Sequence, residues 1–179
     1  MLKKLLALLL CSTLIVGCGL ISESVSTNIG PTTEVLTIGE EESNENVKSV
    51  NLIIDARVLK ESENFEKVAK EYQKYIPEDG YFLKDLNVEV YGDFSIKYLL
   101  EEASKQKDVA IDIASLNGMA YLKSAGQLEA GLLGNMSGWL YTVNGELATS
   151  SIDQQKLQDG DQIHIYYTAD GSKEYEMLK

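Results

Sequence analysis

Side chains that could carry chemistry are few in this sequence. The chain has 179 residues and one histidine, His164, and the sequence shows no Ser-His-Asp arrangement, no phosphate-binding glycine loop with a lysine and no metal-binding histidine pair. Asp159 and Asp161 could act as paired carboxylates, but the tight turn in which they lie accounts for both. His164 alternates with Ile163 and Ile165, so we expect it to face away from the core, exposed, as an idle side chain or a ligand for an ion. The sequence therefore predicts a protein that is not an enzyme.

A short aromatic strand and two Asn-Gly pairs supply the candidate binding residues. Trp139, the only tryptophan, shares one strand face with Tyr141, where it either packs in the core or stacks on a ligand. Asn117-Gly118 is a predicted turn whose backbone amides could also hold a polar ligand group. The candidate ligand-binding residues are Trp139, Tyr141, Asn117, Gly118, Gly138 and Tyr121.

Tyrosine is unusually frequent, with ten tyrosines against three phenylalanines. Tyr121, Tyr141 and Tyr166 would form an amphipathic contact surface if they were exposed and converged. The alternative is that most tyrosines are strand residues with a solvated hydroxyl group.

The start of the chain has the features of an export signal. Lys3 and Lys4 precede the apolar stretch 5–16, which is shorter than the roughly 20 residues that a membrane-spanning helix needs. An aliphatic residue three positions before Cys18, followed by Val16 and Gly17, resembles the lipobox of bacterial lipoproteins. We therefore expect residues 1–17 to be a signal peptide and Cys18 to carry lipid, the alternative being a plain secreted protein. The other cysteine, at position 11, would leave with the signal peptide.

The charge balance excludes some partners. The formal net charge is −12, the sequence pI is about 4.5, and residues 1–17 contain two lysines and no acidic residue. Binding to nucleic acid or to anionic lipid headgroups is disfavoured, because both need a basic patch. The acidic surface is expected to serve solubility, with attraction of divalent cations as the alternative.

Two regions follow the signal peptide. Residues 18–47 are rich in polar and acidic residues and contain no lysine or arginine between 19 and 47, so we expect the lipidated cysteine to be followed by a disordered acidic tether. Residues 48–179 have the length of one domain. Within it, the residue periods predict strands at 50–58, 86–90, 109–113, 139–143 and 162–168, helices at 65–76 and from about 96, and loops through much of the glycine-rich stretch 118–145.

These elements predict an α+β fold: a β-grasp-like mixed sheet with a packed helix, plus one extra helix inserted between the first two strands. Asn117-Gly118, the segment Gly-Trp-Leu-Tyr-Thr-Val-Asn-Gly at 138–145 and the Asp-Gly-Asp turn at 159–161 resemble, in order and spacing, the bacterial transcobalamin-like C-terminal domain. The resemblance implies a β-grasp domain related to the small domain that closes over cobalamin in animal carriers, and a corrinoid as the candidate ligand, with His164 as a candidate ligand of its cobalt. The chain departs from those carriers because it lacks their large helical domain, and from the family because of the extra helix.

Together these observations predict a lipoprotein on the outer face of a membrane that binds a small ligand without catalysis and needs no cofactor. The alternatives are a protein-interaction or structural module of the cell envelope, or a surface protein that binds divalent metal ions.

Overall fold

The computed structural model describes residues 35–39 and 47–171, which lie in one structural unit, Thr33–Lys179. The predicted signal peptide and Cys18 lie outside the described residues. In the part of the chain that the structure describes, no helix has the length and hydrophobicity needed to cross a membrane.

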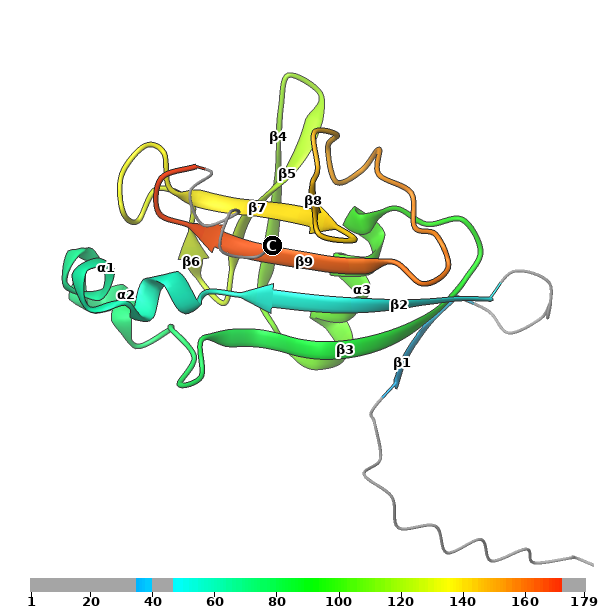
Figure 1. Cartoon of the computed structure of the whole chain (residues 1–179), viewed down its shortest axis with the longest axis horizontal. Coiled ribbons are helices and arrows are strands. Elements are labelled where there is room, and N and C mark those ends of the chain that lie inside the picture. The colour runs from blue at the N-terminus through cyan, green and yellow to red at the C-terminus, as the bar shows by residue number, and fades with distance from the viewer. Residues whose placement is uncertain (1–34, 40–46, 172–179) are drawn as a thin grey trace, which may run out of the picture. The chain divides into compact units, whose positions relative to one another are not determined.

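Two β-sheets form the framework (Figure 1). The main sheet has six strands in the order β1-β3-β2-β9-β7-β8, and a second sheet has three strands in the order β4-β5-β6. The main sheet is mixed, because β1 pairs with β3 and β2 with β9 in parallel while the other pairs are antiparallel. The strands of the main sheet are β1 Val35–Ile38, β2 Val47–Asp55, β3 Tyr81–Tyr91, β7 Gly138–Val143, β8 Glu146–Leu147 and β9 Gln162–Thr168. Those of the second sheet are β4 Ile111–Leu116, β5 Met119–Ala125 and β6 Leu128–Glu129.

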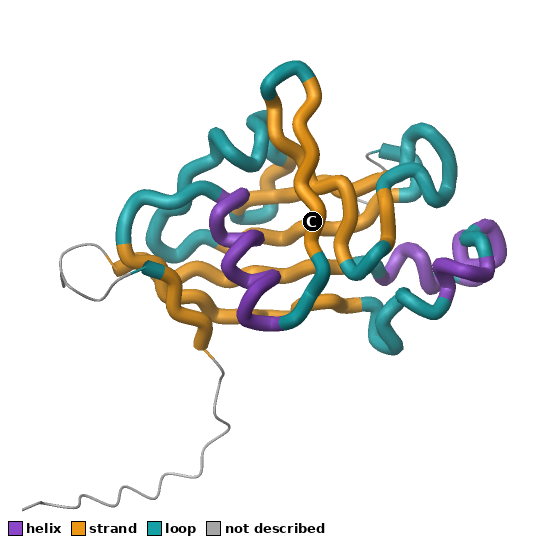
Figure 2. Tube along the Cα trace, turned by 180° about the vertical axis from the view of Figure 1, so that it is seen from behind, coloured by secondary structure: helices purple, strands orange, loops and turns teal. Residues whose placement is uncertain are grey.

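One helix covers one face of the main sheet. Helix α3, Ile96–Lys107, begins after Ser95, whose side chain accepts a hydrogen bond from the backbone N–H of Tyr98. Its apolar stripe is fully buried, and Figure 2 shows the helix lying across the strands. The stripe consists of Ile96, Leu99, Leu100 and Ala103. The predicted α+β mixed sheet with a packed helix is therefore confirmed.

The predicted tether is ordered in part. Val35–Ile38 forms β1, and Leu36 and Ile38 are each only 2% exposed. The backbone carbonyl of Thr37 also accepts a hydrogen bond from the Gln106 side chain on α3. The prediction that disorder extends to residue 47 is wrong for these four residues, because two alternate apolar side chains are enough to bury one face of a short edge strand.

The segment between β2 and β3 differs from the single predicted helix. It contains the 3₁₀ helix η1, Arg57–Lys60, and two short helices, α1 Ser62–Lys67 and α2 Lys70–Gln73. Val68 has extended backbone and is 1% exposed, so burying its side chain interrupts the helix. The Gln73 side chain donates hydrogen bonds to the carbonyls of Phe65 and Val68, which have lost their helical partners. Phe65, which the helical pattern placed on the buried face, is 39% exposed.

The glycine-rich stretch is more regular than expected, because β5 and β6 lie within it. Both Asn-Gly pairs form two-residue hairpin turns as predicted, with Asn117 and Asn144 at φ of 53° and 54°. The first turn joins β4 to β5, and the hairpin that they form projects beyond the main sheet (Figure 1).

Substitutions in β1 test whether this strand belongs to the folded core. Leu36→Ala should lower the free energy of unfolding by about 2 kcal/mol or more, because it leaves a cavity beside buried strands. Val35→Ala, at a position 47% exposed on the same strand, should change it by less than about 0.5 kcal/mol. Urea unfolding followed by tryptophan fluorescence measures both, and equal small effects would mean that β1 belongs to the tether.

Candidate functional site

A cavity of about 270 Å³ lies between the β4–β5 hairpin and β7. The hairpin contributes residues 116 and 119–122, β7 contributes 139–141, and segment 148–152 with Ile165 completes the lining. Most of these side chains are aliphatic or aromatic, and the polar groups come mainly from the short segment after β8. The cavity can therefore receive an apolar group.

The strand periods explain how the walls are built. On β5, Ala120 and Leu122 are buried while Tyr121 between them is 42% exposed. On β7, Trp139 and Tyr141 share a face because alternate residues of a strand point the same way. The cavity is therefore lined both by buried residues of β5 and β7 and by exposed residues of the hairpin.

Trp139 is both a core residue and a wall of the cavity. Its indole N–H donates to the backbone carbonyl of Leu128 at 2.9 Å, and its ring makes an edge-to-face contact with Tyr167 at 5.2 Å between centroids. The polar edge of the indole is thus satisfied within the protein, and only apolar ring surface is offered to a ligand.

Tyr141 anchors the segment that closes the cavity. Its hydroxyl donates to the backbone carbonyl of Ser150 at 2.8 Å. Burial raises the pKa of Tyr141, so the hydroxyl stays neutral and keeps this hydrogen bond at physiological pH. Tyr141 thus positions the segment 148–152.

The structure brings three of the six candidate binding residues together. Trp139, Tyr141 and Tyr121 line the cavity. Asn117 and Gly118 lie at the hairpin tip next to the lining but are not part of it, and Gly138 is buried at the start of β7. A Cβ atom at Gly138 would lie 3.2 Å from the Cβ of Ala130, so close packing explains this glycine.

The condition for a tyrosine contact surface, that Tyr121, Tyr141 and Tyr166 are all exposed, is not met. Tyr121 is exposed, but Tyr141 is 8% exposed and Tyr166 only 2%. Tyr166 also faces away from Tyr167 and the cavity side of β9, because neighbouring strand residues point in opposite directions.

Sequence reasoning missed two exposed apolar residues beside the cavity. Leu116 is 64% exposed and Met119 52%, and they are directly paired across the hairpin. The signal was present, since both residues flank a predicted Asn-Gly turn, where exposed side chains are usually polar.

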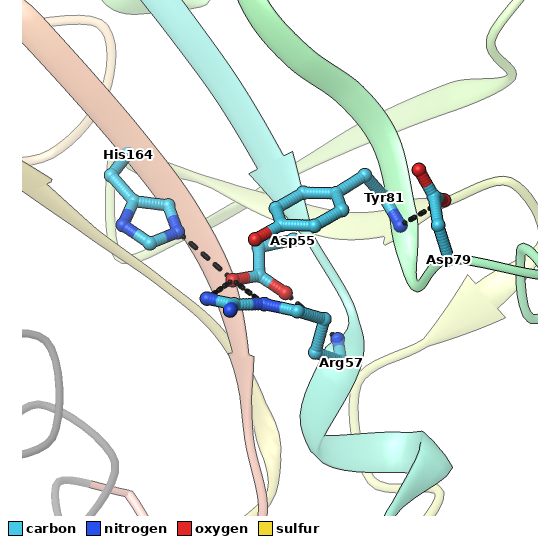
Figure 3. A network of polar contacts seen from close by, with 5 residues as sticks. All are labelled: Asp55, Arg57, Asp79, Tyr81 and His164. Atoms are coloured by element: carbon cyan, nitrogen blue, oxygen red, sulfur yellow. Dashed lines mark hydrogen bonds and ion pairs between the residues drawn. The ribbon is translucent and has the colours of Figure 1, made fainter.

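A separate polar network surrounds the buried carboxylate of Asp55 at the end of β2 (Figure 3). Arg57 donates to Oδ2 of Asp55 through Nε at 2.9 Å and Nη2 at 2.6 Å, and its backbone N–H donates to Oδ1 at 2.8 Å. His164 Nε2 lies 3.2 Å from the same Oδ2 and must carry the hydrogen, because an ionised carboxylate only accepts. The guanidinium of Arg57 also stacks over the Tyr81 ring at 4.8 Å.

The network sets the charge state of Asp55. Burial by itself would raise the pKa of Asp55, but the hydrogen bonds from His164 and Arg57 outweigh burial and lower the pKa to about 2. Asp55 is therefore ionised at every physiological pH.

The expectation that His164 is a lone exposed histidine is wrong. Its side chain is 19% exposed and paired with Asp55, 109 residues earlier in the chain. Among the described residues, no group of three or more His, Cys, Asp or Glu side chains is placed to hold a metal ion. Cation binding by the acidic surface stays a prediction.

Comparisons with known proteins give a family match over part of the chain and a likeness in fold to one solved structure. Residues 97–169, from the start of α3 to just after β9, match the model of a family described as a domain of unknown function, DUF4430. A crystal structure of haptocorrin in complex with Cbi is 13% identical in sequence, with a TM-score of 0.51 over 70% of this chain and 26% of haptocorrin. The chain thus spans about a quarter of haptocorrin's length, and the likeness shows that the domain shares a fold with that part of haptocorrin.

A second solved structure is less similar. It comes from Ruminococcus gnavus, carries a provisional description as a metal-binding protein, and is 16% identical, with a TM-score of 0.40 over 68% of this chain and 96% of that one. No curated protein matches the chain.

The hydrogen bonds around Asp55 predict how the free energy of unfolding changes with pH in the acid range. A carboxyl whose pKa is about 2 when folded and near 3.8 when unfolded contributes about 2 kcal/mol of stability above pH 4, which is lost as the pH falls toward 2. Asp55→Asn should lose at least that much at neutral pH and show a flatter dependence in acid, in urea unfolding at several pH values.

A surface carboxylate provides the control. Asp112 pairs with Lys123 at 2.9 Å but its side chain is 55% exposed, so Asp112→Asn should cost less than about 1 kcal/mol. If Asp55→Asn and the unsubstituted chain lost stability in parallel from neutral pH to acid, the role of the network would be refuted.

Proposed function

We propose that the described domain is a non-catalytic binding module that holds the apolar part of a small ligand in the cavity between the β4–β5 hairpin and β7. The apolar lining, open beside the exposed side chains of Leu116, Met119 and Tyr121, is the observation that carries the proposal. A cavity bounded by buried aromatic residues with few polar groups is typical of ligand sites.

The size of the cavity limits what it can enclose. Its volume of about 270 Å³ lies just below the range, roughly 300–1,000 Å³, of pockets that enclose drug-sized ligands. A ligand larger than the cavity would therefore place only one of its own faces or edges against this domain. The rest of that ligand would stay uncovered.

The finer proposal is that the ligand is a corrinoid. Haptocorrin, whose fold this domain shares in part, was crystallised with Cbi, and this chain aligns with about a quarter of haptocorrin. A corrinoid would be held by a partial site, so we expect weak binding, with dissociation constants of about micromolar or higher.

The proposed location follows from the start of the chain. Lys3, Lys4, the apolar stretch 5–16 and Cys18 support export and attachment of lipid to Cys18, on the outer face of a membrane. Two acyl chains on that residue would make the anchoring stable.

The exposed face of the hairpin favours a second candidate function, docking of an envelope protein. Leu116 pairs with Met119 and Ala114 with Tyr121, and directly paired residues lie on the same face of a hairpin. Adjacent exposed apolar side chains of this kind often mark a protein contact.

Titration with cobinamide and cobalamin, by calorimetry and absorbance on the chain without residues 1–18, tests the first candidate. Thr149 is exposed and lines the cavity, so Thr149→Trp should fill the cavity and weaken binding by about tenfold or more. Thr37→Trp, the same change at an exposed position on β1, should leave binding unchanged. If neither cobinamide nor cobalamin binds, the proposal that the ligand is a corrinoid is rejected. If a corrinoid binds equally well to the Thr149→Trp variant, the proposal that it binds in the cavity is rejected.

Co-purification from membranes tests the second candidate. The double substitution Leu116→Ser and Met119→Ser should abolish recovery of a specific envelope protein by removing the apolar face of the hairpin. Met136→Ser alters another methionine, 70% exposed and outside the cavity lining, and should leave recovery intact. Equal recovery with the unsubstituted chain, the double variant and the Met136→Ser variant would exclude the hairpin as the docking surface.

A further inference from the structure

The chain contains two Asn-Gly pairs with the same local structure. Asn117 and Asn144 have φ of 53° and 54°, and the glycines that follow them both have φ of 78°. Each pair forms the two-residue turn of a β-hairpin. Sequence and backbone therefore give the two asparagines the same intrinsic reactivity, and only their surroundings differ.

The Asn144 side chain is held by hydrogen bonds on both sides of its amide. Its Nδ2 donates to Oδ1 of Asp161 at 2.9 Å, and its Oδ1 accepts from the backbone N–H of Gln162 at 2.9 Å. Asp161 is itself fixed, because it is 5% exposed and its Oδ2 accepts from the backbone N–H of Gln158. Turning the Asn144 amide requires both bonds to break.

Asn117 is exposed and belongs to the two-residue turn between Leu116 and Met119 that ends the β4–β5 hairpin. Over the ranges 35–39 and 47–171, no hydrogen bond holds its side-chain amide or the backbone N–H of Gly118. A Cβ atom added at Gly118 would meet nothing within 4 Å, so the turn has open space around it. The amide of Asn117 can therefore rotate toward the backbone nitrogen of Gly118.

We propose that Asn117-Gly118 is a site of spontaneous deamidation, from which Asn144-Gly145 is protected by its hydrogen bonds. The nitrogen of Gly118 loses its proton to hydroxide and bonds to Cγ of Asn117, while the Cγ–Nδ2 bond breaks and Nδ2 leaves as ammonia after taking a proton from water. Glycine favours this step because it has no Cβ to hinder the approach. Water then opens the resulting succinimide at either carbonyl carbon, giving aspartate or isoaspartate, so that one water is consumed for each ammonia released.

The product changes the surface beside the cavity. A carboxylate replaces a neutral amide between Leu116 and Met119, both of which line the cavity, and isoaspartate adds a methylene group to the backbone of the turn. A charge at this position disfavours covering the hairpin with an apolar ligand or partner. This consequence rests on the proposed function, whereas the reaction itself does not.

Peptide mapping by mass spectrometry on the full chain tests the site. The folded protein is incubated at mildly alkaline pH, and conversion at both asparagines is followed in time, with a parallel sample unfolded in urea. In the folded protein Asn117 should convert about tenfold or more faster than Asn144, because Asn144 must first give up two hydrogen bonds. In urea the two rates should become equal.

Equal rates in the folded protein, or faster conversion of Asn144, would overturn the proposal. Asn117→Gln serves as the control, since its longer side chain must close a larger ring: conversion at position 117 should stop while the rate at Asn144 is unchanged. Failure here leaves the cavity proposal intact, because Thr149→Trp tests the cavity without involving the turn.

Discussion

The parallel pairing of β2 with β9 is the constraint on which the rest of the domain depends. It joins Asn51–Asp55 near the beginning of the fold to Gln162–Tyr166 at its end, in the middle of the main sheet. One end of the pairing is held by the Asp-Gly-Asp turn, where Asp159 accepts from the backbone N–H of Ser49 and the N–H of Gly160 donates to the carbonyl of Ser49. The other end is held by the buried carboxylate of Asp55 and His164. Because β7 pairs with β9, this arrangement also fixes the strand that carries Trp139 and Tyr141.

Features specified by short stretches of sequence could be predicted. Helix α3 follows a serine cap and has an apolar stripe, β9 alternates between polar and apolar residues, and both Asn-Gly turns require a positive φ that these residues tolerate. Features that depend on distant partners could not. Strand β1 has only two inward side chains and is stabilised by β3, some 50 residues later, and the break at Val68 depends on the core that receives its side chain.

The candidate site shows the same division. Trp139 and Tyr141 were identified because their strand pattern and turn are local. The indole N–H of Trp139 is hydrogen-bonded within the protein, while its ring lines the cavity, so ligand binding by Trp139 stays a prediction. Leu116 and Met119 were missed although they flank a predicted Asn-Gly turn, and only the amount of their exposure depends on how far the hairpin projects from the main sheet. His164 was misjudged because no pattern within a strand reveals a carboxylate contributed by another strand.

On the proposal that Cys18 carries lipid, the docking of β1 against β3 would limit how far the domain can stand from a membrane. If Cys18 carries lipid, the chain that separates the lipid from the fold ends at Val35 rather than near Lys48. The sixteen residues 19–34 can span at most about 55 Å when fully extended, roughly half the reach of a tether that continued to residue 47. If Cys18 is lipidated, the domain and any partner that it binds would therefore lie within about that distance of the bilayer surface.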